Sequence, residues 1–316
     1  MFAQASFLSI AHNKKLRCEK FLNQMEQVIP WKDFLDVLVP FYTEKETGRK
    51  RKELLMMLKI YFLQKWYDLS DPGMEDAIYD RCSFQKFLDI DLIGGGVPDE
   101  TTILNFRHFL EEHRLQDKLF EVVQELLQKK GLIVQTGTIV DATTISASPS
   151  TKNKDRKRDP EMGSTKKGNQ WFFGMKAHIG TDLHGIVHTL KCTSASVHDK
   201  VMSSFLFRDT DRVRLGDKAY GKQEEKKAAR KNHIVYGIAD KGSRDHPISG
   251  KQEKRNRQFS SVRSFVEHPF QVLKCQWNFR KVRYRGIEKN RLHLTVLFAL
   301  CNLYRVRRQL LAPVVA

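Results

Sequence analysis

The chain has 316 residues, 41% hydrophobic and 29% charged, which is a globular composition with enough length for one large domain or two ordinary ones. Its 55 basic and 37 acidic residues give a net charge of +18, and 15 basic against 3 acidic residues lie between positions 251 and 308, so we expect a nucleic-acid partner. No apolar run is long enough to span a bilayer, and the five cysteines are scattered with no C-x-x-C pair, which argues against a membrane protein, a zinc knuckle and a disulfide framework and favours the cytoplasm.

The first 130 residues are predicted to form a helical domain. Apolar residues at helical spacing predict helices at residues 53–67, 71–79, 99–110 and 115–129. Asp71, which precedes a proline, and Asp99 are expected to be N-caps, because their carboxylates can accept hydrogen bonds from free backbone N–H groups. Gly131 is expected to end the fourth helix, since glycine readily adopts the left-handed conformation found there.

After residue 131 the pattern changes to short runs of β-branched and alternating residues. Strands are predicted at residues 136–145, 175–182, 185–192, 213–215 and 234–239, the second and third forming a hairpin. A last amphipathic helix is predicted over residues 287–308. We therefore expect a mixed α/β fold, in which the helical domain of residues 1–130 precedes a mixed sheet flanked by helices at residues 131–316.

The stretch from residue 146 to 171 is rich in Ser, Lys, Asn, Asp and Gly. It is too polar to be buried, and we expect a loop that stays mobile until it meets a ligand. The aromatic run Trp171-Phe172-Phe173 ends this stretch. Such rings can stack on nucleic-acid bases, but burial in the core is the more common role.

Two aspartates follow apolar strands and are candidates for chemistry. Asp141 follows Thr-Ile-Val, and Asp217 follows Val-Arg-Leu-Gly. Paired carboxylates at strand ends can bind a divalent metal, which prefers hard oxygen ligands. The alternative is that each aspartate only caps a following turn or helix. The pair His198-Asp199 is read in that second way, as a cap.

Glu267 is the third candidate carboxylate. Arg263, Glu267 and Lys274 fall on one helical face, an arrangement suited to holding metal and phosphate together, although an ordinary surface ion pair is the alternative. Pro269 should kink the helix after Glu267. Alternatively, the helix begins near Ser264, and Ser264 and Glu267 form a capping box.

Several segments, in this order, resemble transposases of the bacterial insertion sequence five family. They are residues 69–76 (LSDPGMED), 97–107 (VPDETTILNFR), 138–144 (TIVDATT), 166–178 (KKGNQWFFGMKAH), 216–221 (GDKAYG), 266–270 (VEHPF), 282–286 (VRYRG) and 297–303 (LFALCNL). The resemblance covers residues 10–308. It implies a ribonuclease H-like catalytic core whose first Asp lies on the first strand, whose second Asp follows the fourth strand, and whose Glu lies on a late helix.

The resemblance implies that Asp141, Asp217 and Glu267 are the catalytic residues and the ligands of two Mg²⁺ or Mn²⁺ ions. The family signature Y-x-x-R-x-x-x-E followed by six residues and K matches at Arg263, Glu267 and Lys274, but Ser260 stands at the tyrosine position. The matching motifs also supply candidate DNA-binding residues, which are Arg263, Lys274, Lys176, Arg283 and Arg285.

The resemblance implies a transposase that binds the inverted-repeat ends of its element, cleaves phosphodiester bonds there and joins the 3′-hydroxyls to target DNA. Two ends must be joined together, so we expect a homodimer or larger assembly on double-stranded DNA. The helical domain should bind the ends, with residues 49–52 and Arg107 as candidate contacts. Two alternatives stay open: a non-catalytic DNA-binding protein derived from a transposase, and a nuclease of the same fold without strand transfer.

Overall fold

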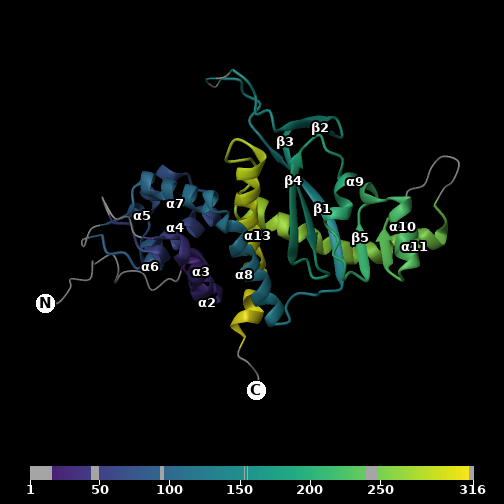
Figure 1. Cartoon of the computed structure of the whole chain (residues 1–316), viewed down its shortest axis with the longest axis horizontal. Coiled ribbons are helices and arrows are strands. Elements are labelled where there is room, and N and C mark those ends of the chain that lie inside the picture. The colour runs from purple at the N-terminus through teal and green to yellow at the C-terminus, as the bar shows by residue number, and fades with distance from the viewer. Residues whose placement is uncertain are drawn as a thin grey trace. The chain divides into compact units, whose positions relative to one another are not determined.

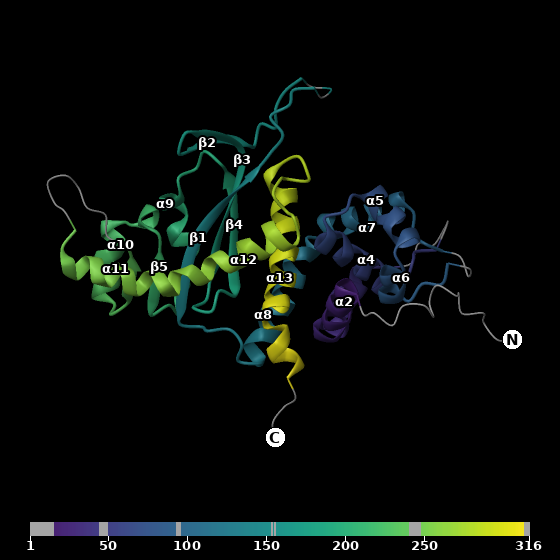
Figure 2. The same cartoon turned by 180° about the vertical axis from the view of Figure 1, so that it is seen from behind.

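The structure is a computed structural model of the chain that describes residues 16–43, 50–92, 96–152, 154, 156–239 and 248–312. The chain divides into two compact units. The helical unit comprises Met1–Gln64, Leu69–Arg107 and Leu303–Ala316, and the sheet unit comprises Lys65–Asp68 and His108–Asn302. The sequence-based boundary at residue 130 stays a prediction, and this division assigns Leu303–Ala316 to the helical unit. Figures 1 and 2 show the chain from two opposite sides.

The helical unit is built on short helices around an aromatic core. Its elements are α2 (Arg17–Val28), α3 (Trp31–Leu38), η1 (Val39–Phe41), α4 (Leu54–Tyr67), α5 (Asp71–Asp80), α6 (Cys82–Leu88) and α7 (Glu100–Glu112), of which α4 and α7 end in the sheet unit. The Phe62 ring lies 5.7 Å from the rings of both Trp31 and Phe34. Helix α4 is buried on nearly all sides, which explains its largely apolar sequence.

The predicted helix ends are confirmed at two positions and wrong at one. The Asp99 carboxylate accepts the N–H of Thr102 at 2.6 Å and caps α7, and Gly131 follows α8 (Leu115–Lys129) with a φ of +65°. Helix α5, however, is capped by Ser70, whose hydroxyl accepts the N–H of Gly73 at 3.1 Å. Asp71 is already the first helical residue, so the expectation that it is the N-cap was wrong.

The sheet unit contains one mixed sheet. Its strands are β1 (Gly137–Ser146), β2 (Gly163–Lys167), β3 (Gln170–Thr181), β4 (Val187–Ser194), β5 (Val213–Gly216) and β6 (Val235–Ile238). The order is β2-β3-β1-β5-β6, with β4 also paired to β3. The β1–β3 and β3–β4 pairs are antiparallel, whereas β1–β5 and β5–β6 are parallel. The helical unit and the mixed sheet flanked by helices confirm the predicted mixed α/β class, and the ribonuclease H-like core stays an expectation from the resemblance.

The prediction of a loop over residues 146–171 was wrong at its C-terminal end. Residues 163–167 form β2, which pairs with the start of β3 in an antiparallel hairpin. Gly168 turns the chain with a φ of +60°. The polar composition correctly indicated exposure, but it does not exclude a strand, because the backbone hydrogen bonds are satisfied by the neighbouring strand rather than by water.

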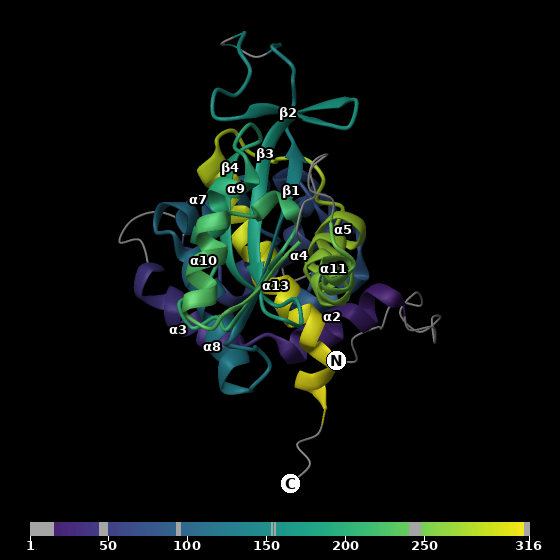
Figure 3. The same cartoon turned by 90° about the vertical axis from the view of Figure 1, so that its right-hand side faces the viewer.

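Helices cover both faces of the sheet beside β5 and β6. Helix α10 (Gln223–Lys231) and helix α11 (Gly250–Arg263) lie on opposite faces (Figure 3). Gly237 in β6 lets α11 approach closely. A Cβ atom there would lie 2.9 Å from the Phe259 ring and 2.3 Å from the Leu215 side chain.

Helix α11 continues directly into the segment that carries Glu267. The segment runs through a 3-10 turn, η4 (Ser264–Val266), then α12 (Glu267–Gln271) and a π-helical turn, η5 (Val272–Gln276). The 3-10 turn precedes Pro269, which has no N–H to donate to the carbonyl of residue 265. A helix start at Ser264 was wrong, because α11 begins at Gly250 with a capping box formed by Ser249 and Gln252.

Helix α13 (Ile287–Leu311) holds the β4 edge of the sheet through its residues in the sheet unit. The buried Asn302 amide accepts the Val187 N–H at 2.9 Å and donates to the Val187 carbonyl at 2.7 Å. Arg291 forms a bidentate ion pair of 2.7 and 2.8 Å with Asp117 of α8. No helix among the described residues has the length and apolar character needed to span a membrane.

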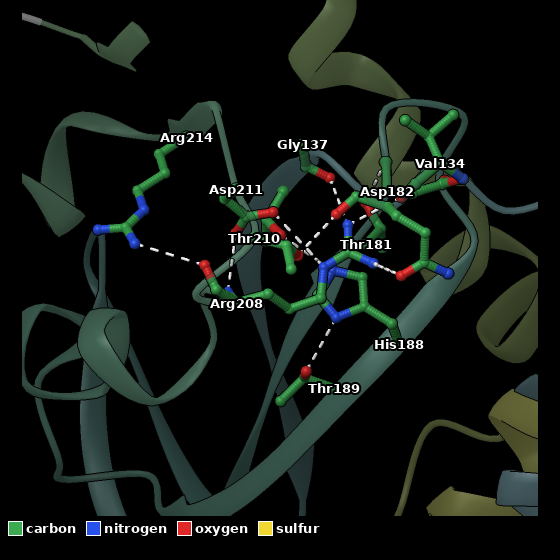
Figure 4. Close-up of polar contacts among 12 residues, drawn as sticks. Val134, Gly137, Thr181, Asp182, His188, Thr189, Arg208, Thr210, Asp211 and Arg214 are labelled. Carbon is green, nitrogen blue, oxygen red and sulfur yellow. Dashed lines mark hydrogen bonds and ion pairs between the residues drawn. The ribbon is translucent and has the colours of Figure 1, made fainter. Parts of the chain in front are cut away.

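A buried polar cluster closes the amino end of β1 (Figure 4). The Arg208 guanidinium donates to the carbonyls of Val134 and Gly137 at 2.8 and 2.9 Å and forms an ion pair of 3.4 Å with the buried Asp211. Asp182, also buried, accepts the N–H of Val134 at 2.8 Å. Burial, helped by Arg208, lowers the pKa of His188 to about 3, so this histidine is neutral at physiological pH.

Candidate active site

Asp141 and Asp217 lie on neighbouring parallel strands. Asp141 is the fifth residue of β1, directly after the β1–β5 register ends at the pair Val140–Gly216. Asp217 directly follows that same pair on β5. The two aspartates therefore occupy adjacent positions where the β1–β5 pairing ends, although β1 itself continues to Ser146 beside β3, so the expected strand end is wrong for Asp141.

Each aspartate also accepts a local backbone hydrogen bond. Asp141 Oδ1 accepts the N–H of Ala142, and Asp217 Oδ1 accepts the N–H of Lys218, both at 2.8 Å. Asp217 is the N-cap of the short turn η3 (Lys218–Tyr220). The capping interpretation is therefore correct for Asp217, but capping uses one oxygen and leaves the other carboxylate oxygen for other contacts.

The helical segment brings a cation and a third carboxylate to the same place. Arg263, the last residue of α11, donates from Nη1 to Asp217 Oδ1 at 3.1 Å. Glu267 begins α12 one turn later and is exposed. The turn η4 between them contacts β1, so the segment crosses the sheet beside the strand that carries Asp141.

The electrostatics of Asp141 reflect these neighbours. Burial raises the pKa of this carboxyl to about 6, from an ordinary value of 3.8. Repulsion from Glu267 and Asp217 raises it further, while the Ala142 N–H and Arg263 oppose the shift. The three predicted carboxylates are thus close enough to interact electrostatically, and a cation between them would relieve the repulsion among their negative charges.

Lys274 is hydrogen-bonded to β1, the strand that carries Asp141. Its ammonium donates to the Thr143 hydroxyl at 2.5 Å and to the Thr144 carbonyl at 3.1 Å. It lies in the π-helical turn, an element that is rare in proteins and frequent at functional sites. Arg263 and Lys274, the two basic residues of the predicted common face, therefore both point toward the sheet: Arg263 contacts Asp217 after β5, and Lys274 contacts β1.

A fourth carboxylate, Asp199, was not selected from the sequence. It lies in α9 (Asp199–Met202) and accepts a hydrogen bond from the Lys176 ammonium at 3.0 Å. His178 Nδ1 lies 3.8 Å from the same oxygen, and burial lowers the pKa of His178 to about 4. Burial raises the pKa of Tyr220, and Asp199, Asp141 and Asp217 each add to that shift. The only sequence signal was the pair His198-Asp199, in which His198 does cap α9, as expected.

The remaining candidate DNA contacts differ in their exposure and in their partners within the protein. Lys176 is held by Asp199 and by the Val197 carbonyl at 2.8 Å, and Arg283 forms an ion pair of 2.6 Å with Asp68. Arg285 is exposed. Of the contacts expected in the helical domain, Arg107 is buried and paired with Asp71 at 3.2 Å. Arg49 lies outside the described residues.

The donor set suits a hard divalent cation in kind. Carboxylate oxygens are the ligands that Mg²⁺ and Mn²⁺ prefer, and the mutual repulsion at Asp141 is what a bound cation would remove. In the described part of the chain, however, no group of three or more His, Cys, Asp or Glu side chains is arranged to hold a metal ion. With Arg263 bonded to Asp217 and Glu267 exposed, the three carboxylates form an open arrangement that does not converge on one point.

Comparison with known proteins identifies the family. Residues 134–303 match the model of the Transposase DDE domain, and residues 11–109 match that of a second transposase domain, DUF772. One solved structure, the crystal structure of the Mos1 strand transfer complex, aligns with 12% identity over 77% of this chain and 82% of that chain. Its TM-score of 0.20 is too low to bear on the fold. The first match spans more than half of the chain, which therefore belongs to the DDE transposases, enzymes that cleave DNA and transfer its strands.

Proposed function

We propose that this transposase binds the inverted-repeat ends of an insertion sequence, hydrolyses phosphodiester bonds there and joins the resulting 3′-hydroxyls to target DNA. The observation that carries the proposal is the position of Asp141 and Asp217 directly after the last β1–β5 pair, beside a helical segment that presents Glu267. These three residues fall within the region matched by the DDE domain.

In this proposal Asp141, Asp217 and Glu267 hold two divalent cations, Mg²⁺ or Mn²⁺. When bound, the cations would activate the attacking water or 3′-hydroxyl and stabilise the leaving oxygen. The protein's own contribution is to place the carboxylates. Burial raises the pKa of Asp141, and the charge of Arg263 opposes that shift and favours the ionised form that would bind a cation.

Two basic residues would orient the scissile phosphate. Arg263 offers a planar fork of donors, of which Nη1 donates to Asp217. Lys274 is held on β1 by Thr143 and Thr144, two and three residues after Asp141, which supports a fixed positive charge on the strand that carries Asp141. The strongly basic stretch from residue 251 to 308 would contribute phosphate contacts along the DNA.

Two assays with one set of variants test this function. Alanine at Asp141, Asp217 or Glu267 should abolish cleavage of end DNA and joining of a pre-cleaved end, while gel-shift binding is largely kept, because backbone contacts come from Lys and Arg. A wild-type protein that cleaves but does not join pre-cleaved ends would identify a nuclease. A wild-type protein that binds but does neither would identify a DNA-binding protein without catalysis. A folded alanine variant at Asp141 that cleaves at the wild-type rate would refute the site.

We further propose a homodimer or larger assembly on DNA, because two element ends must be joined together. Light scattering of the protein with end DNA, under conditions that support joining, should give at least two protomers for each pair of ends. A single protomer on a joined product would contradict the proposal.

A further inference from the structure

The β2–β3 hairpin extends beyond the strands that form the rest of the sheet. The pairs of β3 with β1 and β4 begin at Gly174 and Met175, so residues 170–173 of β3 pair with β2 on its hairpin side. Figure 3 shows β2 and the start of β3 beyond the end of β1. This part of the hairpin is therefore available for contacts outside the sheet.

One face of this hairpin combines aromatic rings and positive charges. Lys166 pairs directly with Trp171, and Ser164 pairs with Phe173. Residues directly opposite in an antiparallel pair share a face, as do residues two apart on one strand. The Arg158 guanidinium lies 5.5 Å from the centre of the Phe173 ring. We call Arg158, Lys166, Trp171 and Phe173 the hairpin face.

Trp171 was expected to be in the core, and that expectation was wrong. Its side chain is 71% exposed, the most exposed of the large hydrophobic residues described. Leaving an indole in water forgoes the gain of burying a large apolar surface, so such a ring beside cations is typical of a binding surface. The exposed ring is not held by packing against other side chains. The pairing of β2 with β3 sets the position of the backbone that carries it.

The approach to the hairpin is held in place by two acidic side chains. Asp159 Oδ2 accepts the N–H of Gly286 at 2.7 Å, and Glu161 Oε2 accepts the N–H of Ile287 at 2.8 Å. Both contacts anchor the chain just before β2 to the start of α13. The hairpin face is thus presented by a tethered element, which reduces the entropy lost when a ligand binds.

We propose that the hairpin face binds a DNA strand, with Trp171 stacking on an unpaired or unstacked base and Lys166 and Arg158 contacting phosphates. This inference rests on the proposed function, which supplies DNA as the partner. Stacking on an aromatic ring tolerates any base sequence, and neighbouring cations follow the backbone. The charge favours a polyanion over a protein partner, since Lys152, Lys154 and Arg156 on the segment leading to β2 are also exposed.

The contact lies away from the chemistry. Trp171 is eight residues along β3 from Ile179, the partner of Asp141. At a rise of about 3.3 Å per residue, that separation is up to roughly 26 Å, or about seven or eight nucleotides of DNA. The hairpin face should therefore act on DNA affinity more than on the bond-breaking step.

The test uses the full chain and three end DNAs: a perfect duplex, a duplex with a short mismatched bubble about seven nucleotides from the cleaved end, and a single strand. Fluorescence anisotropy measures Kd. Trp171→Ala should weaken binding of the bubble and the single strand by about tenfold, within the range of base stacking, and binding of the duplex by less. Trp171→Phe should restore most of the affinity. Phe205→Ala removes another exposed ring, 59% exposed, and is the matched control that should bind like the wild type.

The cation and the ring should also differ in salt dependence. Lys166→Ala should reduce the slope of log affinity against log salt by about 0.7–0.9, the value for one phosphate contact, whereas Trp171→Ala should leave the slope unchanged. In cleavage assays Trp171→Ala should raise the DNA concentration for half-maximal rate more than it lowers the maximal rate.

Three outcomes would overturn the inference. Equal affinity of Trp171→Ala and wild type for all three DNAs would show that the ring does not contact DNA. An equal loss in Phe205→Ala would show that the effect is not specific to the hairpin. A changed oligomeric state of Trp171→Ala in sedimentation without DNA, at unchanged affinity, would identify a protein interface. A wild type that binds none of the DNAs would instead refute the proposed function itself.

Discussion

Replacing Asp141 by asparagine should make the metal-free protein more stable at neutral pH while it destroys activity. The pKa of Asp141 is raised from 3.8 to about 6, so folding disfavours the ionised carboxylate. At about 1.36 kcal/mol per pKa unit, the ionised side chain costs about 3 kcal/mol of folding free energy at about pH 7.5. Asparagine removes that cost and still accepts the Ala142 N–H through its carbonyl oxygen.

The direction in which stability changes with pH follows from the linkage between proton binding and folding. Because the folded protein holds the proton more tightly, wild-type stability falls as pH rises from about 4 to 6, and the cost is fully present above about pH 6. The advantage of Asp141→Asn should therefore shrink from about 3 kcal/mol at about pH 7.5 to about 1 kcal/mol at about pH 4.5. Urea unfolding with a chelator present, at both pH values, measures the difference.

Asp217→Asn is the matched control. Asp217 is half-exposed and accepts a hydrogen bond from Arg263, so amidation should weaken an ion pair and give no gain in stability. Adding Mg²⁺ or Mn²⁺ should stabilise the wild type and not Asp141→Asn. If Asp141→Asn were no more stable than wild type at neutral pH, or if its advantage did not change with pH, the ionised Asp141 carboxylate would not carry this cost.

Three further predictions concern the site and the fold. Cleavage by the wild type at low Mg²⁺ should fall about tenfold per pH unit below about pH 6, because Asp141 must lose its proton to bind metal; a flat pH–rate profile between about pH 5 and 7 would contradict this. Arg263→Ala should move that acid limb to higher pH, since Arg263 lowers the pKa of Asp141, and Arg263→Lys should move it less; an unmoved limb would make Arg263 a surface ion-pair partner only. Arg208→Ala should cost about 3–5 kcal/mol in urea unfolding, because it leaves the buried Asp211 without a counter-charge and with only the hydrogen bond from the N–H of residue 208. The exposed Lys32→Ala is the control, and a cost below about 1 kcal/mol would show that the cluster does not hold β1.

Several features of this protein were readable from the sequence because they depend on neighbours along the chain. A strand shows itself by a short β-branched run, and the residue after the run is located with it, which is how Asp141 and Asp217 were identified. Asp99 and Gly131 were correctly assigned because a helix end is a local event that needs particular side chains or a left-handed φ. The change from helical to strand-like patterns after residue 131 then indicated a helical domain followed by a mixed sheet with helices.

Other features were decided only by tertiary structure. The contacts that shape the site join distant positions, as when Arg263 bonds to Asp217 and Lys176 bonds to Asp199. No local pattern encodes such a pair, because it depends on which strands are neighbours and on where the α11–α12 segment crosses them. Trp171 shows the same limit: its residue type predicted burial, but its exposure follows from a hairpin that extends beyond the sheet, where no other described element packs over it closely enough to cover the ring.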